Sequence, residues 1–209
     1  MSILSNLFPK NLKTFFKKFR KFNALNNLDK KLLKYINYKN GFYIECGAND
    51  GVDQSNTWYF EKYMNWNGLL IEAHPKIFNE LKKNRSKKNI LINNFLVSNN
   101  YKSRIINISN NDLMSKFCSD KKESLPTQAI TLTEILKKKK IPKLIDLFSL
   151  DVEGHEFEVM DGIDFKNYKF KFFLIETNNF NKLNNYLMTK NYKFIDKLSN
   201  HDYLYSSNE

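Results

Sequence analysis

The chain has 209 residues, of which 42% are hydrophobic and 27% are charged, a balance typical of one soluble globular domain. Its formal net charge of +12 favours anionic partners such as nucleic acid, phosphorylated metabolites, acidic glycans or membrane surfaces, without choosing among them. No run reaches the roughly 18 apolar residues of a membrane span, and the N-terminus lacks the apolar core of a signal peptide. We therefore exclude an integral membrane protein and expect a cytoplasmic one.

The two cysteines, Cys46 and Cys118, lack the spacing of metal ligands. Cys46 lies in an apolar strand pattern, where a small buried thiol is ordinary. Cysteine usage therefore fits a reducing compartment and indicates no disulfide framework.

Residues 1–40 are predicted to be a basic, helical N-terminal appendage to a single domain over residues 41–209. The first 23 residues place phenylalanines at helical spacing, with Lys and Arg mostly between them. Such a helix can lie on an anionic membrane, or it can dock its phenylalanines on the domain, which is the interpretation we favour. A second helical pattern covers residues 28–38.

From residue 41 onward, short apolar runs alternate with helical patterns. Strands are predicted at residues 41–46, 68–73, 89–98, 103–109, 144–152 and 171–178. Helices are predicted at residues 54–65, 74–86, 131–140, 155–162 and 181–190. Residues 119–127 are predicted to be a polar loop, and residues 191–206 a hairpin with its turn at 199–201. This order predicts a doubly wound, mostly parallel α/β sheet with a C-terminal antiparallel hairpin.

The segment ECGANDG connects the first strand to the next helix, at the edge of the sheet where such folds bind ligands. Gly47 and Gly51 allow the chain to pass close to a ligand, while Glu45 and Asn49 offer polar contacts. The pattern is neither the G-x-G-x-x-G of a dinucleotide site nor the G-K-[ST] of a triphosphate site. A pyrophosphate ligand is therefore not expected.

The second strand ends near Glu72, where dinucleotide folds carry an acidic residue that binds both ribose hydroxyls. A nucleoside without a polyphosphate fits this arrangement, and S-adenosylmethionine is the common cofactor of that description. Ser55 and Asn56 are predicted either to cap the next helix or to reach the methionine carboxylate. Further cofactor contacts are expected from Ala48, Ala73, Leu96 and Asp151.

A second group of polar residues lies in the segment SLDVEGHE, where Asp151 and Glu153 share one side of an extended chain. We expect Asp151, or as second choice His155, to act as a general base on a hydroxyl, with Glu153 and Glu176 orienting the acceptor. Asp151, Glu153 and Glu176 are also predicted as ligands of Mg²⁺ or Mn²⁺. In the alternative interpretation, Glu153 and Glu156 only cap the following helix and His155 is a polar surface residue.

Five segments resemble, in order and spacing, the FkbM-type methyltransferases that use S-adenosylmethionine. They are ECGANDG, SNTWYFEKYMNWNGLLIEAHP, TLTEIL, SLDVEGHEFEVMDGIDF and FFLIETN, and together they span roughly residues 41–206. The resemblance implies a class I methyltransferase fold, which is Rossmann-like, and methyl transfer to a hydroxyl of a sugar, glycan or small metabolite. Glu45 departs from the Asp of many class I methyltransferases, and its longer side chain is expected to reach the cofactor's amino group.

We therefore expect an S-adenosylmethionine-dependent O-methyltransferase with a small-molecule or glycan acceptor. One alternative, suggested by the positive charge, is an RNA methyltransferase, although no lysines cluster near Asp151 or Glu176. Another alternative is a non-catalytic module held at a membrane surface by residues 1–23, which the set of strand-end carboxylates disfavours. Residues 110–127 are expected to shape the acceptor pocket.

Overall fold

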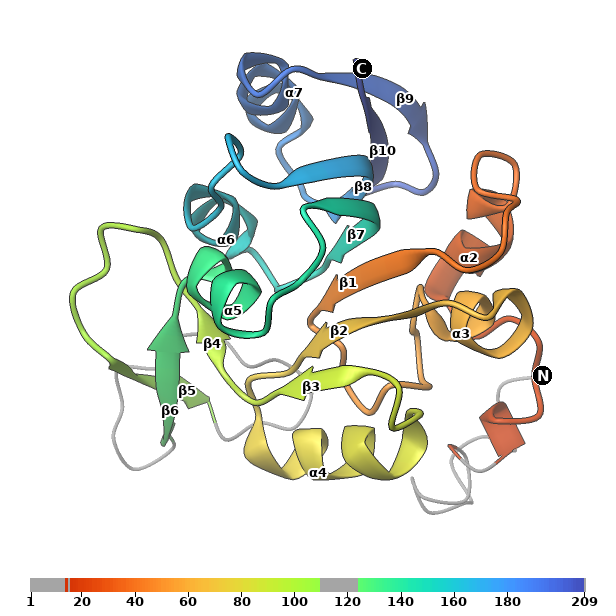
Figure 1. Ribbon diagram of the computed structural model, residues 1–209, viewed down its shortest axis with the longest axis horizontal. Coiled ribbons are helices and arrows are strands. Elements are labelled where there is room, and N and C mark those ends of the chain that lie inside the picture. Colours follow the sequence, from red (N-terminus) through yellow and green to blue (C-terminus); the bar gives the residue numbers. More distant parts are fainter. Residues whose placement is uncertain (1–13, 15, 110–123, 209) are drawn as a thin grey trace.

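A seven-stranded sheet forms the centre of the computed structural model, which describes residue 14 and residues 16–109 and 124–208 (Figure 1). The strand order is β3-β2-β1-β7-β8-β10-β9. Neighbouring strands run parallel except around β10, which is antiparallel to both β8 and β9. The strands are β1 (Phe42–Cys46), β2 (Asn67–Ile71), β3 (Ile90–Ile92), β7 (Leu144–Leu150), β8 (Lys169–Glu176), β9 (Tyr192–Lys197) and β10 (Asp202–Ser207). The predicted doubly wound sheet and its antiparallel C-terminal hairpin are confirmed.

Helices cover both faces of this sheet, so the central strands are apolar on both sides. On one face, the core combines the sheet with buried apolar side chains of α5 (Leu132–Lys138), α6 (Glu156–Asp161) and α7 (Phe180–Thr189). On the other face, it combines the sheet with α2 (Leu28–Leu32), α3 (Trp58–Met64) and α4 (Pro75–Asn84). None of the helices in the described part of the chain is long and apolar enough to cross a bilayer.

The carboxyl ends of β1, β2 and β7 lie side by side at one edge of the sheet, because β1 is in register with a parallel neighbour on each side. Cys46, the last residue of β1, pairs with Ile71 of β2 and with Leu150 of β7. The chain segments that leave these three strands therefore start side by side. The strand order reverses at β1, since β2 lies on one side of β1 and β7 on the other. Ligand sites of doubly wound sheets lie at such a point.

The N-terminal part of the chain contributes to the core. Leu28 and Leu32 of α2 and the following Ile36 are buried against the sheet. A short 3₁₀ helix, η2 (Leu25–Asn27), precedes α2, and Phe22 stacks on Tyr59 of α3 with ring centroids 4.8 Å apart. Residues 28–36 are therefore packed into the domain.

Closer to the N-terminus, the chain contacts the loop between β1 and α3. The Thr14 hydroxyl donates to Asp50 at 2.9 Å, and Lys17 forms an ion pair with Asp53. Phe16 and Phe19 are 57% and 73% exposed, and the expected docking of phenylalanines on the domain is seen at Phe22, which stacks on Tyr59. Residues 1–13 and 15 of the predicted basic helix lie outside the described residues.

A small second sheet contains three strands, in the order β4 (Phe95–Leu96), β6 (Ser124–Ile130) and β5 (Ile105–Ser109). The single strand predicted at residues 89–98 is wrong, because Asn93 and Asn94 separate β3 from β4 and the two halves join different sheets. The Asn93 amide donates to the main-chain oxygens of Glu72 and Ala73, which turns the chain away from β2.

The loop predicted at residues 119–127 is wrong from Ser124 onward. Residues 124–127 belong to β6, where Thr127 and Ala129 are buried in alternation with exposed neighbours. The period of two is what a strand with one buried face requires. The rest of the predicted loop, together with residues 110–123 of the predicted acceptor pocket, lies outside the described residues.

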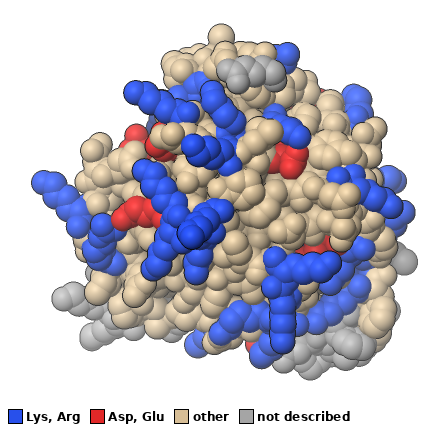
Figure 2. All heavy atoms as spheres, in the orientation of Figure 1, with Lys and Arg blue, Asp and Glu red and all other residues tan. Residues whose placement is uncertain are grey.

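Positive charge is spread over the molecule. Figure 2 shows Lys and Arg side chains in several groups on the face drawn, with uncharged surface between them. The net charge of +12 therefore does not mark one continuous binding surface on this face.

A buried arginine connects the elements beneath the glycine turn. The guanidinium of Arg85, directly after α4, donates to Glu61 at 2.6 Å, to the Gly51 main-chain oxygen at 2.9 Å and to the Tyr43 hydroxyl at 2.7 Å. Burial opposes the ionisation of Glu61, but the charge of Arg85 and further hydrogen bonds hold the Glu61 pKa below its ordinary value. One side chain thus joins β1, the glycine turn, α3 and α4.

We predict that Arg85→Met lowers the free energy of unfolding by about 3–5 kcal/mol, because it leaves buried carboxylates without their cation. Lys83→Met is the matched control, since exposed Lys83 pairs only with Glu80 of the same helix, and it is expected to change stability by less than about 1 kcal/mol. Urea unfolding of both variants measures the difference. Equal, small effects would show that the Arg85 network does not hold these elements together.

Candidate active site

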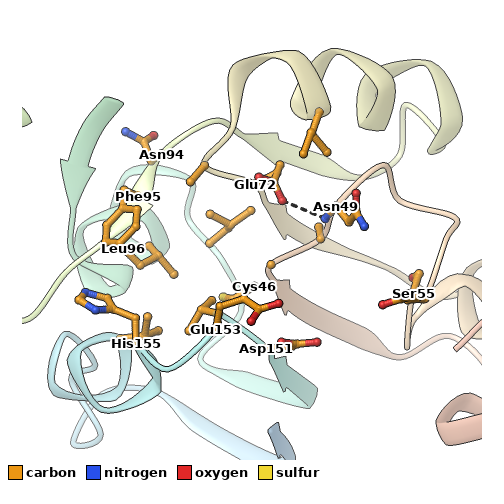
Figure 3. Close-up of a pocket in the computed structure, with 18 of the residues that line it drawn as sticks. Cys46, Asn49, Ser55, Glu72, Asn94, Phe95, Leu96, Asp151, Glu153 and His155 are labelled. Atoms are coloured by element: carbon orange, nitrogen blue, oxygen red, sulfur yellow. Dashed lines mark hydrogen bonds between the residues drawn. The ribbon is translucent and has the colours of Figure 1, made fainter. Parts of the chain in front are cut away.

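A pocket opens at the carboxyl ends of β1, β2 and β7, where the fold places ligand sites (Figure 3). The structure brings most of the predicted site residues together around it: Gly47, Ala48, Asn49, Ser55, Glu72, Ala73, Leu96, Asp151, Glu153 and His155. Residues without a predicted role also line it: Cys46, Asp53, Gln54, Ile71, Ile77, Asn94, Phe95, Val152 and Val159. Glu45, Gly51, Asn56 and Glu176 are not among the described lining residues.

Gly47 occupies a position that admits no side chain. Its φ is +77°, and a Cβ atom there would lie 1.7 Å from the main-chain oxygen of Asp151. Main-chain hydrogen bonds fix this approach, since Gly47 donates to Ile71 at 3.1 Å and Asp151 donates to Cys46 at 3.2 Å. The loops after β1 and β7 are therefore in direct contact, and glycine is required there by packing as well as by the backbone angles.

Glu72 follows β2 and is buried, with its carboxylate fixed by main-chain donors. Asn49 N–H donates to Oε2 at 2.9 Å, and His74 N–H donates to Oε1 at 2.7 Å. Figure 3 shows the first of these bonds and the position of Glu72 in the pocket. A carboxylate oxygen can accept more than one hydrogen bond, so a main-chain donor and a ligand hydroxyl can bind the same oxygen.

The structure does not bring Glu45 into the pocket, which differs from its expected contact with the cofactor's amino group. The Glu45 carboxylate accepts hydrogen bonds from Asn56 N–H at 2.8 Å and from the Thr57 hydroxyl at 2.6 Å, and it lies 3.8 Å from Arg85. The physical reason is that a buried carboxylate is stable only when its lone pairs are satisfied and its charge is paired. Here the protein satisfies both conditions.

Ser55 both lines the pocket and belongs to this network. Its hydroxyl donates to Glu45 at 3.1 Å and accepts from Trp58 N–H at 3.1 Å. This bond lies in the turn before α3, whose N-cap is Thr57, so the helix begins at Trp58 instead of at the predicted residue 54. Asn56 is directed away from the pocket lining, because its amide donates to the Ser149 hydroxyl at 3.0 Å.

Gly51 also lies outside the pocket lining. Its φ is +79°, and a Cβ atom there would lie 2.5 Å from the side chain of Leu81 and 2.7 Å from that of Arg85. The structure therefore gives Gly51 a packing role beneath the turn, where a ligand contact was expected.

Asp151, the residue after β7, lines the pocket with its carboxyl group in contact with Glu176 at the end of β8. Burial, the hydrogen bond with Glu176 and the nearby negative charges of Glu176, Glu153 and Asp202 raise the pKa of Asp151 to about 9. Two carboxyl groups in contact share a proton, because two adjacent negative charges repel each other. Glu176 thus acts on the pocket through Asp151.

His155 lies at a different part of the pocket. Its ring packs on Phe95, with centroids 4.9 Å apart, and burial lowers the pKa of the imidazole. In Figure 3, His155 lies beside Phe95 and Leu96, whereas the carboxyl group of Asp151 is directed to the side on which Ser55 lies. The two side chains predicted as alternative bases are therefore not brought together.

The turn between β7 and α6 separates the two glutamates of the DVEGHE segment. Glu156, the first residue of α6, accepts from Gly154 N–H at 2.8 Å in the turn before the helix. Glu153 lines the pocket instead, with φ of +56°, a conformation that costs energy in a residue with a side chain. Such strain is concentrated at functional sites.

The predicted metal ligands receive no support from the geometry. Within the part of the chain that the structure describes, no group of three or more His, Cys, Asp or Glu residues is arranged to hold a metal ion. The contact between Asp151 and Glu176 is a carboxyl pair and is not completed by Glu153 into a ligand set.

The apolar part of the pocket was not predicted. Phe95 and Ile77 line it next to Leu96, and only Leu96 was expected. The sequence signal for this apolar lining was the pair Asn93–Asn94 in the middle of an apolar run. This pair ends the strand, and Phe95 after it lies in the pocket.

The strand order and the position of the pocket define a class I methyltransferase fold. The family model described as Methyltransferase FkbM domain matches residues 45–205, and the chain belongs to this family. The family implies S-adenosylmethionine as methyl donor.

Two solved structures share the fold. The FkbM methyltransferase of Methylobacillus flagellatus is 12% identical with a TM-score of 0.53, and the match covers 94% of this chain and 59% of that one. The methyltransferase domain of METTL16 is 14% identical with a TM-score of 0.50, and the match covers 88% of this chain and 66% of that one. The present chain therefore spans less than two thirds of either protein's length. No curated protein matches the chain.

We predict that Gly47→Ala is more destabilising than Gly154→Ala by about 2 kcal/mol, a typical cost of overpacking. Both glycines have positive φ, but a Cβ atom at Gly154 meets nothing within 4 Å. The pair of variants therefore separates the contact with Asp151 from the backbone preference. Thermal unfolding measures it, and equal losses would contradict the close approach of the two loops.

We predict that Asp151→Asn removes a pH dependence of stability. The pKa of Asp151 is raised in the folded state, so unfolding releases its proton between about pH 4 and pH 9 and stability falls as pH rises. Asparagine does not ionise, and the variant should gain about 1 kcal/mol or more relative to wild type on going from pH 5 to pH 8.5. Urea unfolding without cofactor, with the exposed Glu80→Gln as control, tests this. Parallel pH profiles for all three proteins would refute it.

Proposed function

We propose that the protein transfers a methyl group from S-adenosylmethionine to a hydroxyl of a sugar, glycan or small metabolite. The observation that carries this proposal is the Glu72 carboxylate, held in the pocket by Asn49 N–H and His74 N–H, where a carboxylate can accept hydrogen bonds from ribose hydroxyls in addition to main-chain donors. A pocket that fixes an acidic residue in this way after the second strand suits a nucleoside.

The other lining residues fit the remaining parts of this cofactor. Phe95, Leu96 and Ile77 offer an apolar surface suited to adenine. Gly47 and Asp151 lie at the ends of β1 and β7, and we assign the methionine end of the cofactor to their side of the pocket. Glu45 is already satisfied by its own network, so the cofactor's amino group is assigned to other acceptors.

The bound cofactor supplies an electrophilic methyl group, and the protein must hold the acceptor hydroxyl and take up its proton. Asp151 is our assignment for the base, since its raised pKa makes the ionised carboxylate a strong proton acceptor. A positive charge bound nearby favours that ionised form. His155 remains the second choice, but its ring lies against Phe95, on the adenine side of the proposed arrangement.

The acceptor class rests on family membership and requires a direct assay. Purified protein is incubated with cofactor carrying a labelled methyl group and with glycan, small-metabolite and RNA fractions of the host. We expect the label in the glycan or metabolite fraction. Label in RNA, with binding that weakens steeply as salt increases, would instead support the RNA alternative.

We predict that Glu72→Gln weakens binding of S-adenosylhomocysteine roughly 10- to 100-fold, the range for losing a charge-assisted hydrogen bond. Glutamine is preferable to alanine because it can still accept a main-chain hydrogen bond, and Glu72 also holds Asn49 and His74 in place. Calorimetry gives the affinity, with Glu80→Gln as control for the lost charge. An affinity within twofold of wild type would place the ribose elsewhere.

We predict that Asp151→Asn lowers turnover roughly 100-fold or more with the identified acceptor, because the amide keeps the shape of the carboxylate and loses its basicity. His155→Asn should lower turnover less. Single-turnover rates of the two variants are measured with and without EDTA. The comparison of variants tests the base, and the effect of EDTA tests the predicted metal ligands. A near wild-type rate for Asp151→Asn with a collapse for His155→Asn would make the histidine the base.

A further inference from the structure

The pocket has the opposite charge to the rest of the chain. Among its described lining residues are the four carboxylates of Asp53, Glu72, Asp151 and Glu153, and no lysine or arginine. The whole chain carries a net charge of +12. A described lining without basic residues, in a protein that has 34 of them, fits a ligand with positive charge.

Asp53 and Glu72 are each held by hydrogen-bond donors of the protein. Asp53 pairs with Lys17, and Glu72 is fixed by two main-chain N–H groups. Asp151 differs, because the register of β7 and β8, which pairs Leu150 with Ile175, places it beside another carboxyl group, that of Glu176. A pair that shares one proton still carries one negative charge, and this charge lies at the side of the pocket assigned to the methionine end.

The C-terminal hairpin holds Glu176 in this position. His201 lies in the turn between β9 and β10, and its Nδ1 is 3.0 Å from Oε1 of Glu176. Thr177 N–H donates to the main-chain oxygen of His201 at 2.8 Å, which ties the hairpin turn to the end of β8. Asp202, which pairs with Glu176 in the sheet register, adds a carboxylate 3.5 Å from His201 Nδ1. The fold thus holds the acidic side chain of Glu176 beside Asp151.

We propose that the Asp151–Glu176 carboxyl pair makes the pocket select the positively charged sulfonium of S-adenosylmethionine over the neutral sulfur of S-adenosylhomocysteine, with Glu176 as a positioning residue. This inference rests on the proposed function. The two ligands differ by one methyl group and one charge, so the pair attracts the methyl donor and loses that attraction once the methyl group has left. Release of the product is thereby favoured.

The test is calorimetric and needs no acceptor. Dissociation constants for both ligands are measured on wild type, the double variant Asp151→Asn/Glu176→Gln and the control Glu80→Gln, at one pH and about 0.15 M salt. We expect the ratio of the S-adenosylhomocysteine constant to the S-adenosylmethionine constant to fall about tenfold in the double variant, which removes the negative charge of the pair, since charges a few ångströms apart near a protein surface interact at least this strongly. The ratio should not change in Glu80→Gln.

The ratio separates selectivity from damage to the fold, because a merely structural role for Glu176 weakens both ligands equally. Asp151→Ser/Glu176→Gln serves as a second double variant if the first folds poorly. An unchanged ratio in the folded variants, with both ligands still bound, overturns the inference and leaves the proposed function intact. Failure of wild type to bind either ligand overturns the proposed function and the inference with it.

Discussion

The close approach of Gly47 to Asp151 and the buried guanidinium of Arg85 constrain the same loop from two sides. On one side of the loop, the main-chain oxygen of Asp151 occupies the space where a Cβ atom of residue 47 would lie. On the other side, Arg85 donates to the Gly51 main-chain oxygen and to the Ser55 and Thr57 hydroxyls. A turn held in this way keeps its shape without a ligand, so binding need not order it. The pocket is therefore largely formed before a cofactor enters.

This arrangement divides the acidic residues around the glycine turn and the pocket into two groups with different roles. Glu45 and Glu61 are paired with Arg85 and serve the scaffold. Glu72 faces the pocket with its carboxylate held by main-chain N–H groups. Asp151 faces the pocket with the carboxyl group of Glu176 beside it. The first group stabilises the turn and the second defines what the pocket attracts. A chain with excess positive charge can thereby keep one site of negative charge at the sheet edge.

Much of this organisation follows from the sequence, because period and spacing determine it. The alternation of strands and helices predicts the doubly wound sheet, and the residues after β1, β2 and β7 had to meet at one edge. Sequence reasoning placed Glu45 in the pocket because it could not know that Arg85, 40 positions later, is buried beneath the turn. It also assigned Phe95 to a long strand, since a break at Asn93 depends on hydrogen bonds to Glu72 and Ala73, which follow β2 and are distant in sequence. Partners far apart along the chain leave no local pattern.

The central claim is that this pocket binds S-adenosylmethionine with its ribose on Glu72. A crystal structure of the protein with S-adenosylhomocysteine tests it most directly. We predict electron density with both ribose hydroxyls on the Glu72 carboxylate, adenine against Phe95 and Leu96, and the methionine end beside Gly47 and Asp151. Density for the nucleoside in another cavity, or a ribose that leaves Glu72 untouched, would contradict the account.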